Sequence, residues 1–217
     1  MSQSVFVTGG TGYMGSRLIP LLVQRGHQVK VLVRQGSEKK FPGSVTRVTG
    51  DALKNGSYTQ QVRGADTFMH LIGVPHPSPA KAKEFREIDF VSAQVALKAA
   101  REVSVRHFIY LSVAHPAPMM RAFIEVRSEC EAMIRTSGIS ATFLRPWYVL
   151  GPGHRWPYVL IPFYWLLGRL PFTKQSAQRL GLIRLSQMIN ALVWSVEKPA
   201  NGIRIMDVPD VRAAQTI

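Results

Sequence analysis

The chain has 217 residues, 46% of them apolar, so it can bury a sizeable core and an intrinsically disordered protein is excluded. A single cysteine, Cys130, excludes a framework of internal disulfide bonds and favours a reducing compartment. The net charge is +14, from 27 basic and 13 acidic residues, which favours anionic partners unless the excess is only a solvated basic face.

Strand and helix patterns alternate along the chain. The run from Val5 to Val7 predicts a buried strand, which leads into a glycine-rich turn and an apolar helix that Pro20 is expected to bend or shorten. The alternation predicts an α/β fold with a doubly wound parallel sheet, a Rossmann fold. It is expected to form one domain over residues 1–217, with a short C-terminal elaboration at 155–217 as a reduced substrate or lid region. Further strands are expected at 28–34, 45–51, 67–73, 106–113, 140–149 and 202–208, and further helices at 81–103, 119–137 and 186–197, the last capped by Ser186.

The turn after the first strand carries glycines at positions 9, 10, 12 and 15. Gly9 lets the chain turn sharply, Gly12 lets backbone amides approach a pyrophosphate, and Gly15 lets the following helix pack close to the strand. The N-terminus of that helix adds a partial positive charge. A strand, a glycine turn and a helix in this order predict a dinucleotide site.

The motifs resemble those of the short-chain dehydrogenase/reductase superfamily, in its extended and atypical, NmrA-like and epimerase-like branches. The matching stretches are T-G-x-x-G-x-x-G from Thr8, HLIG from His70, FIYLS from Phe108 and FLRPWYVLGPG from Phe143. The resemblance implies an NAD(P)-binding Rossmann domain, with Asp51 near the adenine. The expected cofactor contacts are Thr8, Gly9, Gly10, Thr11, Gly12, Tyr13, Met14, Gly15, Arg34, Ser37, Lys39, Asp51, Ala52, Leu71, Ile72, Gly73, Ser112, Arg127 and Pro146.

The end of the second strand indicates which nucleotide is preferred. An acid there would bind the ribose hydroxyl of NAD, but the chain has Arg34 at this position. An arginine accommodates the 2′-phosphate of NADP, and Ser37 and Lys39 in the same loop offer further phosphate contacts. NADP is therefore the expected cofactor, with NAD as the second choice; the alternative is a basic loop that only faces solvent.

The catalytic pair of the superfamily is Tyr-x-x-x-Lys on the helix after the fifth strand. The resemblance places Phe123 at the tyrosine and Arg127 at the lysine, so the usual proton donor is missing and Arg127 is left to hold the ribose or a phosphate. The remaining catalytic candidates are Ser112 as an orienting serine, His115 as an acid–base group and Tyr148 as a substitute phenol. Each of the three also has a purely structural interpretation. No metal site is expected, because no ligand group has the required spacing.

Three functions follow from these motifs. The first is an NADPH-dependent reductase whose substrate is anionic or conjugated and accepts hydride without a proton from the enzyme, as flavins and quinones do. Small atypical members of the superfamily, including flavin and biliverdin reductases, resemble such a reductase. The second is a nucleotide-sensing regulator or assembly subunit without turnover. The third, a sugar-nucleotide epimerase or dehydratase, is disfavoured by the missing tyrosine and the short C-terminal region.

The segment from Trp156 to Phe172 is apolar and aromatic and contains three prolines. It predicts a lid over the substrate pocket or, as the alternative, a surface that faces an anionic membrane or a protein partner. No stretch is long enough to span a bilayer and no signal peptide is expected, so the location is expected to be cytoplasmic or membrane-peripheral. The basic residues form no module for sequence-specific nucleic acid, and the oligomeric state is not predicted.

Overall fold

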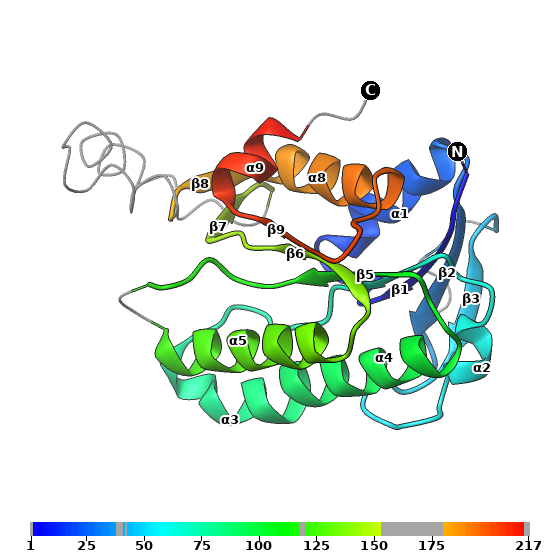
Figure 1. Cartoon of the computed structure of the whole chain (residues 1–217), viewed down its shortest axis with the longest axis horizontal. Coiled ribbons are helices and arrows are strands. Elements are labelled where there is room, and N and C mark those ends of the chain that lie inside the picture. The colour runs from blue at the N-terminus through cyan, green and yellow to red at the C-terminus, as the bar shows by residue number, and fades with distance from the viewer. Residues whose placement is uncertain (1, 38–40, 42, 118–119, 153–179, 215–217) are drawn as a thin grey trace.

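Seven parallel strands form one sheet in the computed structural model (Figure 1), which describes residues 2–37, 41, 43–117, 120–152 and 180–214. The strand order is β3-β2-β1-β4-β5-β6-β9, so the chain starts near the middle, runs to one edge and returns to the other side of β1. The predicted doubly wound parallel sheet is confirmed. The strands are β1 (Ser4–Thr8), β2 (Gln28–Val33), β3 (Thr46–Thr49), β4 (Thr67–His70), β5 (His107–Leu111), β6 (Ser140–Leu144) and β9 (Ile203–Met206).

Helices cover both faces of the sheet (Figure 1). Side chains of a strand alternate between the faces, so Val5 and Val7 of β1 lie in one apolar cluster and Phe6 in the other. On the second face, Phe6, Phe68 and Phe108 stand in register on adjacent strands, with neighbouring ring centroids 5.2 Å apart. The first face packs against α1 (Gly15–Gln24), α8 (Leu185–Glu197) and α9 (Val208–Ala213), and the second against α2 (Thr59–Val62), α4 (Val91–Glu102) and α5 (Arg121–Thr136).

Several expected boundaries are wrong. The strand expected at 140–149 ends at Leu144, because Pro146 has no N–H to donate to a ladder. The continuation, β7 (Tyr148–Leu150), pairs with β8 (Leu182–Arg184) in a separate two-stranded sheet. Helix α8 begins before Ser186, because the N–H of Arg184 donates to the side-chain oxygen of Gln187 and makes Arg184 the N-cap. Pro20 lies inside α1, which continues to Gln24.

The helix expected at 81–103 is divided. It consists of a 3-10 turn η2 (Pro79–Lys81), the short α3 (Ala82–Glu84), a π-helical stretch η3 (Phe85–Phe90) and α4. The wider turn of η3 coincides with a buried carboxylate, Asp89, which lies near the carboxyl ends of the strands.

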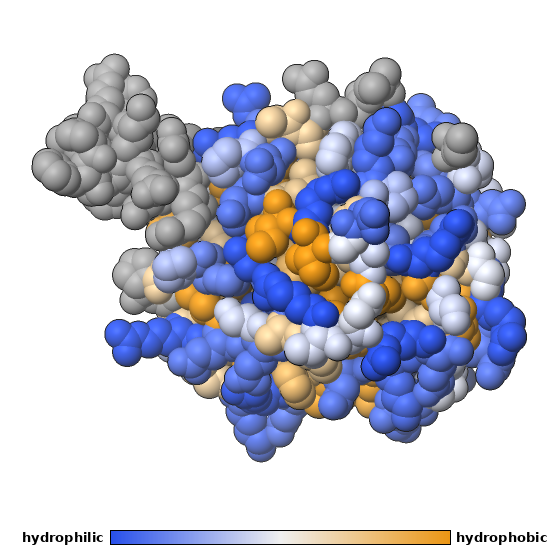
Figure 2. All heavy atoms as spheres, viewed as in Figure 1, coloured by the Kyte–Doolittle hydropathy of each residue, from blue (hydrophilic) through white to orange (hydrophobic). Residues whose placement is uncertain are grey.

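The face in Figure 2 is largely hydrophilic, with apolar surface near its middle, where β6 and β9 run in Figure 1. β9 is an edge strand, and Ile203 and Ile205 are among the large apolar side chains that stay exposed. Arg204 lies between them and gives this edge a charge, which disfavours pairing with a foreign strand.

The segment 156–172 lies outside the described residues, so its role as a lid or as a membrane or partner surface stays a prediction. Within the described ranges, no helix combines the length and the apolar character needed to cross a bilayer.

Candidate functional site

A cavity of about 350 Å³ opens at the carboxyl ends of β1, β2, β3 and β4. The strand order reverses at β1 and β4, and ligands of open parallel sheets bind at such a switch point. The cavity gathers predicted cofactor residues that follow four different strands: Gly9, Thr11, Gly12, Arg34, Asp51, Ala52, Leu71, Ile72 and Gly73.

The glycine turn is tightly enclosed by backbone. Gly9 has φ +77°, and a Cβ there would lie 2.7 Å from the carbonyl carbon of Leu71. A Cβ on Gly15 would lie 2.5 Å from the Cα of Gly10. No real Cβ atom comes so close to backbone, so both positions require glycine.

The turn also offers free donors. The backbone N–H groups of Thr11, Met14 and Gly15 have no acceptor in the described part of the chain. They stand at the N-terminus of α1, where the helix dipole favours negative charge. A turn with these donors and without side chains in the way fits the pyrophosphate of a dinucleotide.

Replacing Gly15 by alanine is expected to weaken nucleotide binding at least about tenfold and to lower stability by about 1–3 kcal/mol, because the turn must move away from α1. Calorimetric titration and urea unfolding measure the two effects. Gly43→Ala is the matched control, because a Cβ on Gly43 meets nothing within 4 Å. Equal affinities in the two variants would contradict the assignment of the turn.

Arg34 is exposed at the end of β2 and lines the cavity. Its guanidinium makes no hydrogen bond or ion pair with any residue that the structure describes. Ser37 lies in the same turn, where its N–H donates to the carbonyl of Arg34 at 3.0 Å, but it does not line the cavity. Lys39 lies outside the described residues. Asp51 lines the cavity, and its carboxylate accepts the N–H of Leu53 at 2.9 Å.

The hydroxyl of Thr8 is directed into the protein. It lies 2.8 Å from Nδ1 of His70, whose Nε2 is 3.3 Å from the hydroxyl of Ser92. Burial, together with the charge of Arg127, lowers the pKa of His70 to about 3, so the imidazole is neutral at physiological pH. Thr8, which directly precedes the glycine turn, is therefore fixed by a buried hydrogen bond with the neutral imidazole of His70.

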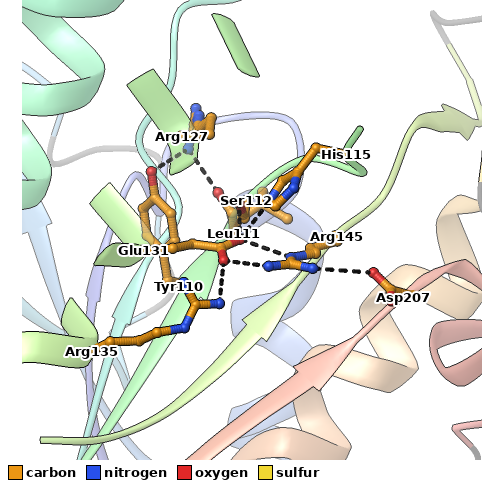
Figure 3. A network of polar contacts seen from close by, with 9 residues as sticks. All are labelled: Tyr110, Leu111, Ser112, His115, Arg127, Glu131, Arg135, Arg145 and Asp207. Atoms are coloured by element: carbon orange, nitrogen blue, oxygen red, sulfur yellow. Dashed lines mark hydrogen bonds and ion pairs between the residues drawn. The ribbon is translucent and has the colours of Figure 1, made fainter. Parts of the chain in front are cut away.

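A buried carboxylate, Glu131 of α5, lies where β5 and β6 end (Figure 3). The hydroxyl of Ser112 donates to it at 2.6 Å, and Arg145 donates to both of its oxygens at 2.9 and 2.6 Å. Arg135 adds a hydrogen bond of 2.8 Å, and Nε2 of His115 lies 3.5 Å away. Two predicted catalytic residues, Ser112 and His115, therefore meet on one carboxylate that the sequence did not single out.

The charge of Glu131 is stabilised by this cluster. Burial alone would raise its pKa, but the contacts with His115, Arg145 and Ser112 outweigh burial and lower the pKa to about 2. Glu131 is therefore ionised at physiological pH, and the hydroxyl proton of Ser112 is directed toward it.

Phe123 and Arg127 lie one turn apart on α5. The ring of Phe123 packs on Phe85 with centroids 5.0 Å apart, and the guanidinium carbon of Arg127 lies 5.1 Å from the Phe123 ring centre. Arg127 is 5% exposed and pairs with Asp89 at 3.0 Å. Its two terminal nitrogens therefore donate inside the protein, while Nε is buried without a hydrogen-bond partner among the described residues.

The remaining predicted site residues lie after β6. The carbonyl of Pro146 accepts the N–H of Ala114 at 2.9 Å, which ties the loops after β5 and β6 together. Tyr148 is half-buried in β7, and burial raises the pKa of its phenol, so the phenol keeps its proton at physiological pH. Tyr13, Met14 and Gly10 belong to the glycine turn but do not line the cavity.

Within the described ranges, no cluster of three or more His, Cys, Asp or Glu side chains could hold a metal ion. Near the carboxyl ends of the strands lie three buried charged residues that the sequence motifs did not identify: Asp89, Glu131 and Arg145.

A family model described as NAD(P)H-binding matches residues 9–157, more than half of the chain. The ceramide reductase of Caulobacter vibrioides is 27% identical over 210 residues, which cover 96% of this chain and 65% of that protein. The 4-hydroxy-2-methyl-3-oxo-4-farnesyl-3,4-dihydroquinoline-1-oxide ketoreductase of Stigmatella aurantiaca is 23% identical over 67% of this chain and 50% of that protein. The chain thus spans less than two thirds of either relative.

The solved structures that the fold resembles include the Bordetella bronchiseptica enzyme WbmH in complex with NAD+. The TM-score is 0.70 at 19% identity, over 95% of this chain and 76% of that one. At this identity the likeness supports the fold alone. The glycine turn, the cavity and the matching family model agree: the chain belongs to the NAD(P)H-binding family and has a Rossmann fold.

Proposed function

We propose that the chain is an atypical NADPH-dependent reductase. The preference for NADPH over NADH rests on Arg34. Its exposed guanidinium lies at the rim of the nucleotide cavity and has no partner among the described residues. A planar guanidinium suits the 2′-phosphate of NADP, because it can donate two parallel hydrogen bonds to a phosphate. The names of the two relatives, a ceramide reductase and a ketoreductase, support a reductase.

Arg34→Ala is expected to weaken NADPH binding about tenfold or more while NADH binding stays unchanged, because a hydrogen bond to a charged group contributes about 1.5–3 kcal/mol. Calorimetry with both nucleotides measures this. Arg63→Ala is the control, since Arg63 is exposed but does not line the cavity. If NADPH and NADH bind equally to the wild type and to Arg34→Ala, the preference for NADPH is refuted.

The parts of the site have separate tasks in this proposal. The glycine turn and the N-terminus of α1 bind the pyrophosphate, and Asp51 and Ala52 border the adenosine. When bound, the reduced nicotinamide supplies a hydride. The residues after β5 and β6, including Ser112 and His115, orient the acceptor at the other end of the site.

The expected class of acceptor follows from the missing tyrosine at position 123. Phe123 has no proton to give, and the hydroxyl proton of Ser112 is directed toward Glu131. We therefore expect an acceptor whose reduction needs no proton from the enzyme, such as a quinone, a flavin or another conjugated, anionic molecule. NADPH oxidation should be faster with menadione than with benzaldehyde, and the reverse order would overturn this acceptor class.

A nucleotide-sensing regulator is the second candidate, and the same absence of a tyrosine at Phe123 favours it. The two candidates differ in turnover. A regulator would bind NADPH with the same Arg34 dependence but would not oxidise it with any acceptor of the quinone or flavin class.

A further inference from the structure

A buried ion pair, Asp89 with Arg127, lies behind the wall of the nucleotide cavity. Asp89 is 1% exposed and Arg127 is 5% exposed, and Nη2 of Arg127 donates to the Asp89 carboxylate at 3.0 Å. A buried pair of this kind contributes little net stability compared with apolar residues of the same volume, and we expect it instead to shape a site.

The Asp89–Arg127 pair holds the loop after β4. The other oxygen of Asp89 accepts the N–H of Val74 at 2.8 Å. The guanidinium lies directly against Gly73, where an added Cβ would overlap Nη2. Gly73, Val74 and Ile88 line the cavity, so the pair lies behind three of its lining residues.

The same pair holds the end of β5. Nη1 of Arg127 donates to the carbonyl of Leu111 at 2.7 Å and reaches the hydroxyl of Tyr110 at 3.4 Å (Figure 3). Ser112 and the loop to His115 follow directly. One guanidinium therefore joins the nucleotide cavity after β4 to the residues proposed to orient the acceptor after β5.

A direct contact between Arg127 and the cofactor does not fit this geometry. Both terminal nitrogens already donate inside the protein, Nε is buried without a partner among the described residues, and Arg127 is not one of the residues that line the cavity. Replacing these hydrogen bonds by one to a ribose would leave Asp89 as an unpaired buried charge.

We propose that Arg127, fixed by Asp89, is a positioning residue: it holds the wall formed by Gly73 and Val74 in the nucleotide-binding shape and sets the end of β5 relative to it. This deepens the proposed function and rests on it for the nucleotide site, but not for the reduction step. The role differs from the one the superfamily resemblance implies for this position, because Arg127 acts through backbone that it holds.

The test measures NADPH affinity by calorimetry and the melting temperature of the ligand-free protein in the same variants. Arg127→Lys keeps the charge but cannot reach Asp89, Leu111 and Gly73 at once, and is expected to weaken NADPH binding about tenfold. Gly73→Ala keeps both charges and directs a methyl group at the guanidinium, and is expected to weaken binding similarly. Lysine lacks the Nη2 atom that the new methyl group would meet. The double variant Gly73→Ala/Arg127→Lys should therefore lose less NADPH binding free energy than the sum of the losses in the two single variants.

The matched control is the exposed pair Arg86 with Glu129, which joins the same two elements, η3 and α5, at the surface. Arg86→Lys should leave NADPH affinity unchanged. A lower melting temperature with unchanged affinity in Arg127→Lys and Gly73→Ala would show that the pair only stabilises the fold, and would overturn this inference. If the wild type bound no NADPH, the proposed function and this inference would fall together.

Discussion

Replacing Glu131 by glutamine is expected to lower the free energy of unfolding by about 3–5 kcal/mol, because it leaves Arg145 without its buried counter-charge. Arg145 donates to both oxygens of Glu131, and an amide offers only one acceptor in their place. Urea unfolding of the two proteins measures the difference.

Glu129→Gln is the control for this substitution. Glu129 is on the same helix, pairs with Arg86 and is exposed, so its loss should change stability by less than about 1 kcal/mol. Equal losses of unfolding free energy in Glu129→Gln and Glu131→Gln would show that the buried cluster stabilises the fold no more than the exposed pair does.

The contribution of Glu131 also depends on pH. Its pKa is about 2 in the folded protein against an ordinary value of 4.5, so the folded state favours the ionised form. The stabilisation is present above pH 4.5 and is lost as the pH falls toward 2. The difference in stability between wild type and Glu131→Gln should shrink over this range.

Phe123→Tyr is expected to raise the rate of aldehyde reduction with NADPH by about 10²–10⁴-fold, the usual contribution of a general acid. The introduced phenol would stand on α5 at the position of the superfamily's proton donor. The guanidinium of Arg127, whose carbon lies 5.1 Å from the ring centre, would stabilise the phenolate that remains after the phenol has donated its proton. Steady-state rates with benzaldehyde measure the gain.

Phe90→Tyr is the matched control, since Phe90 is also half-buried with an arginine, Arg86, 5.8 Å from its ring centre. It should leave aldehyde reduction unchanged. A gain in neither variant, with NADPH binding intact, would show that position 123 does not face the reacting end of the nucleotide.

Local patterns account for what could be predicted from the sequence. The order of strands and helices and the glycine turn follow from short-range periodicity and from backbone positions that exclude a side chain, as at Gly15. Arg34 was identifiable because it has a fixed offset from the turn. The predicted boundaries of strands and helices were wrong where contacts between distant segments determine them. One example is Tyr148, which follows Pro146 and pairs in the small second sheet instead of the main one.

The buried ion pairs could not be predicted in the same way. Asp89 and Glu131 are held by Arg127 and Arg145, which come from elements that meet only in the folded chain. One signal was present: Arg127 and Glu131 share the buried stripe of α5 with Val126, Cys130 and Ile134. A charged residue at an inward helical position indicates a partner, but the periodicity does not say which one.

The two helical layers differ in the sequence separation of the helices that pack together in them. Helices α4 and α5 are near neighbours in sequence and pack on one face, whereas α1 packs against α8, with most of the sheet encoded between them. Closing a long loop costs entropy before any contact rewards it, so the α4–α5 layer is expected to order early during folding and the α1–α8 layer late. The glycine turn opens α1, and the nucleotide site would then be among the last parts of the molecule to take shape.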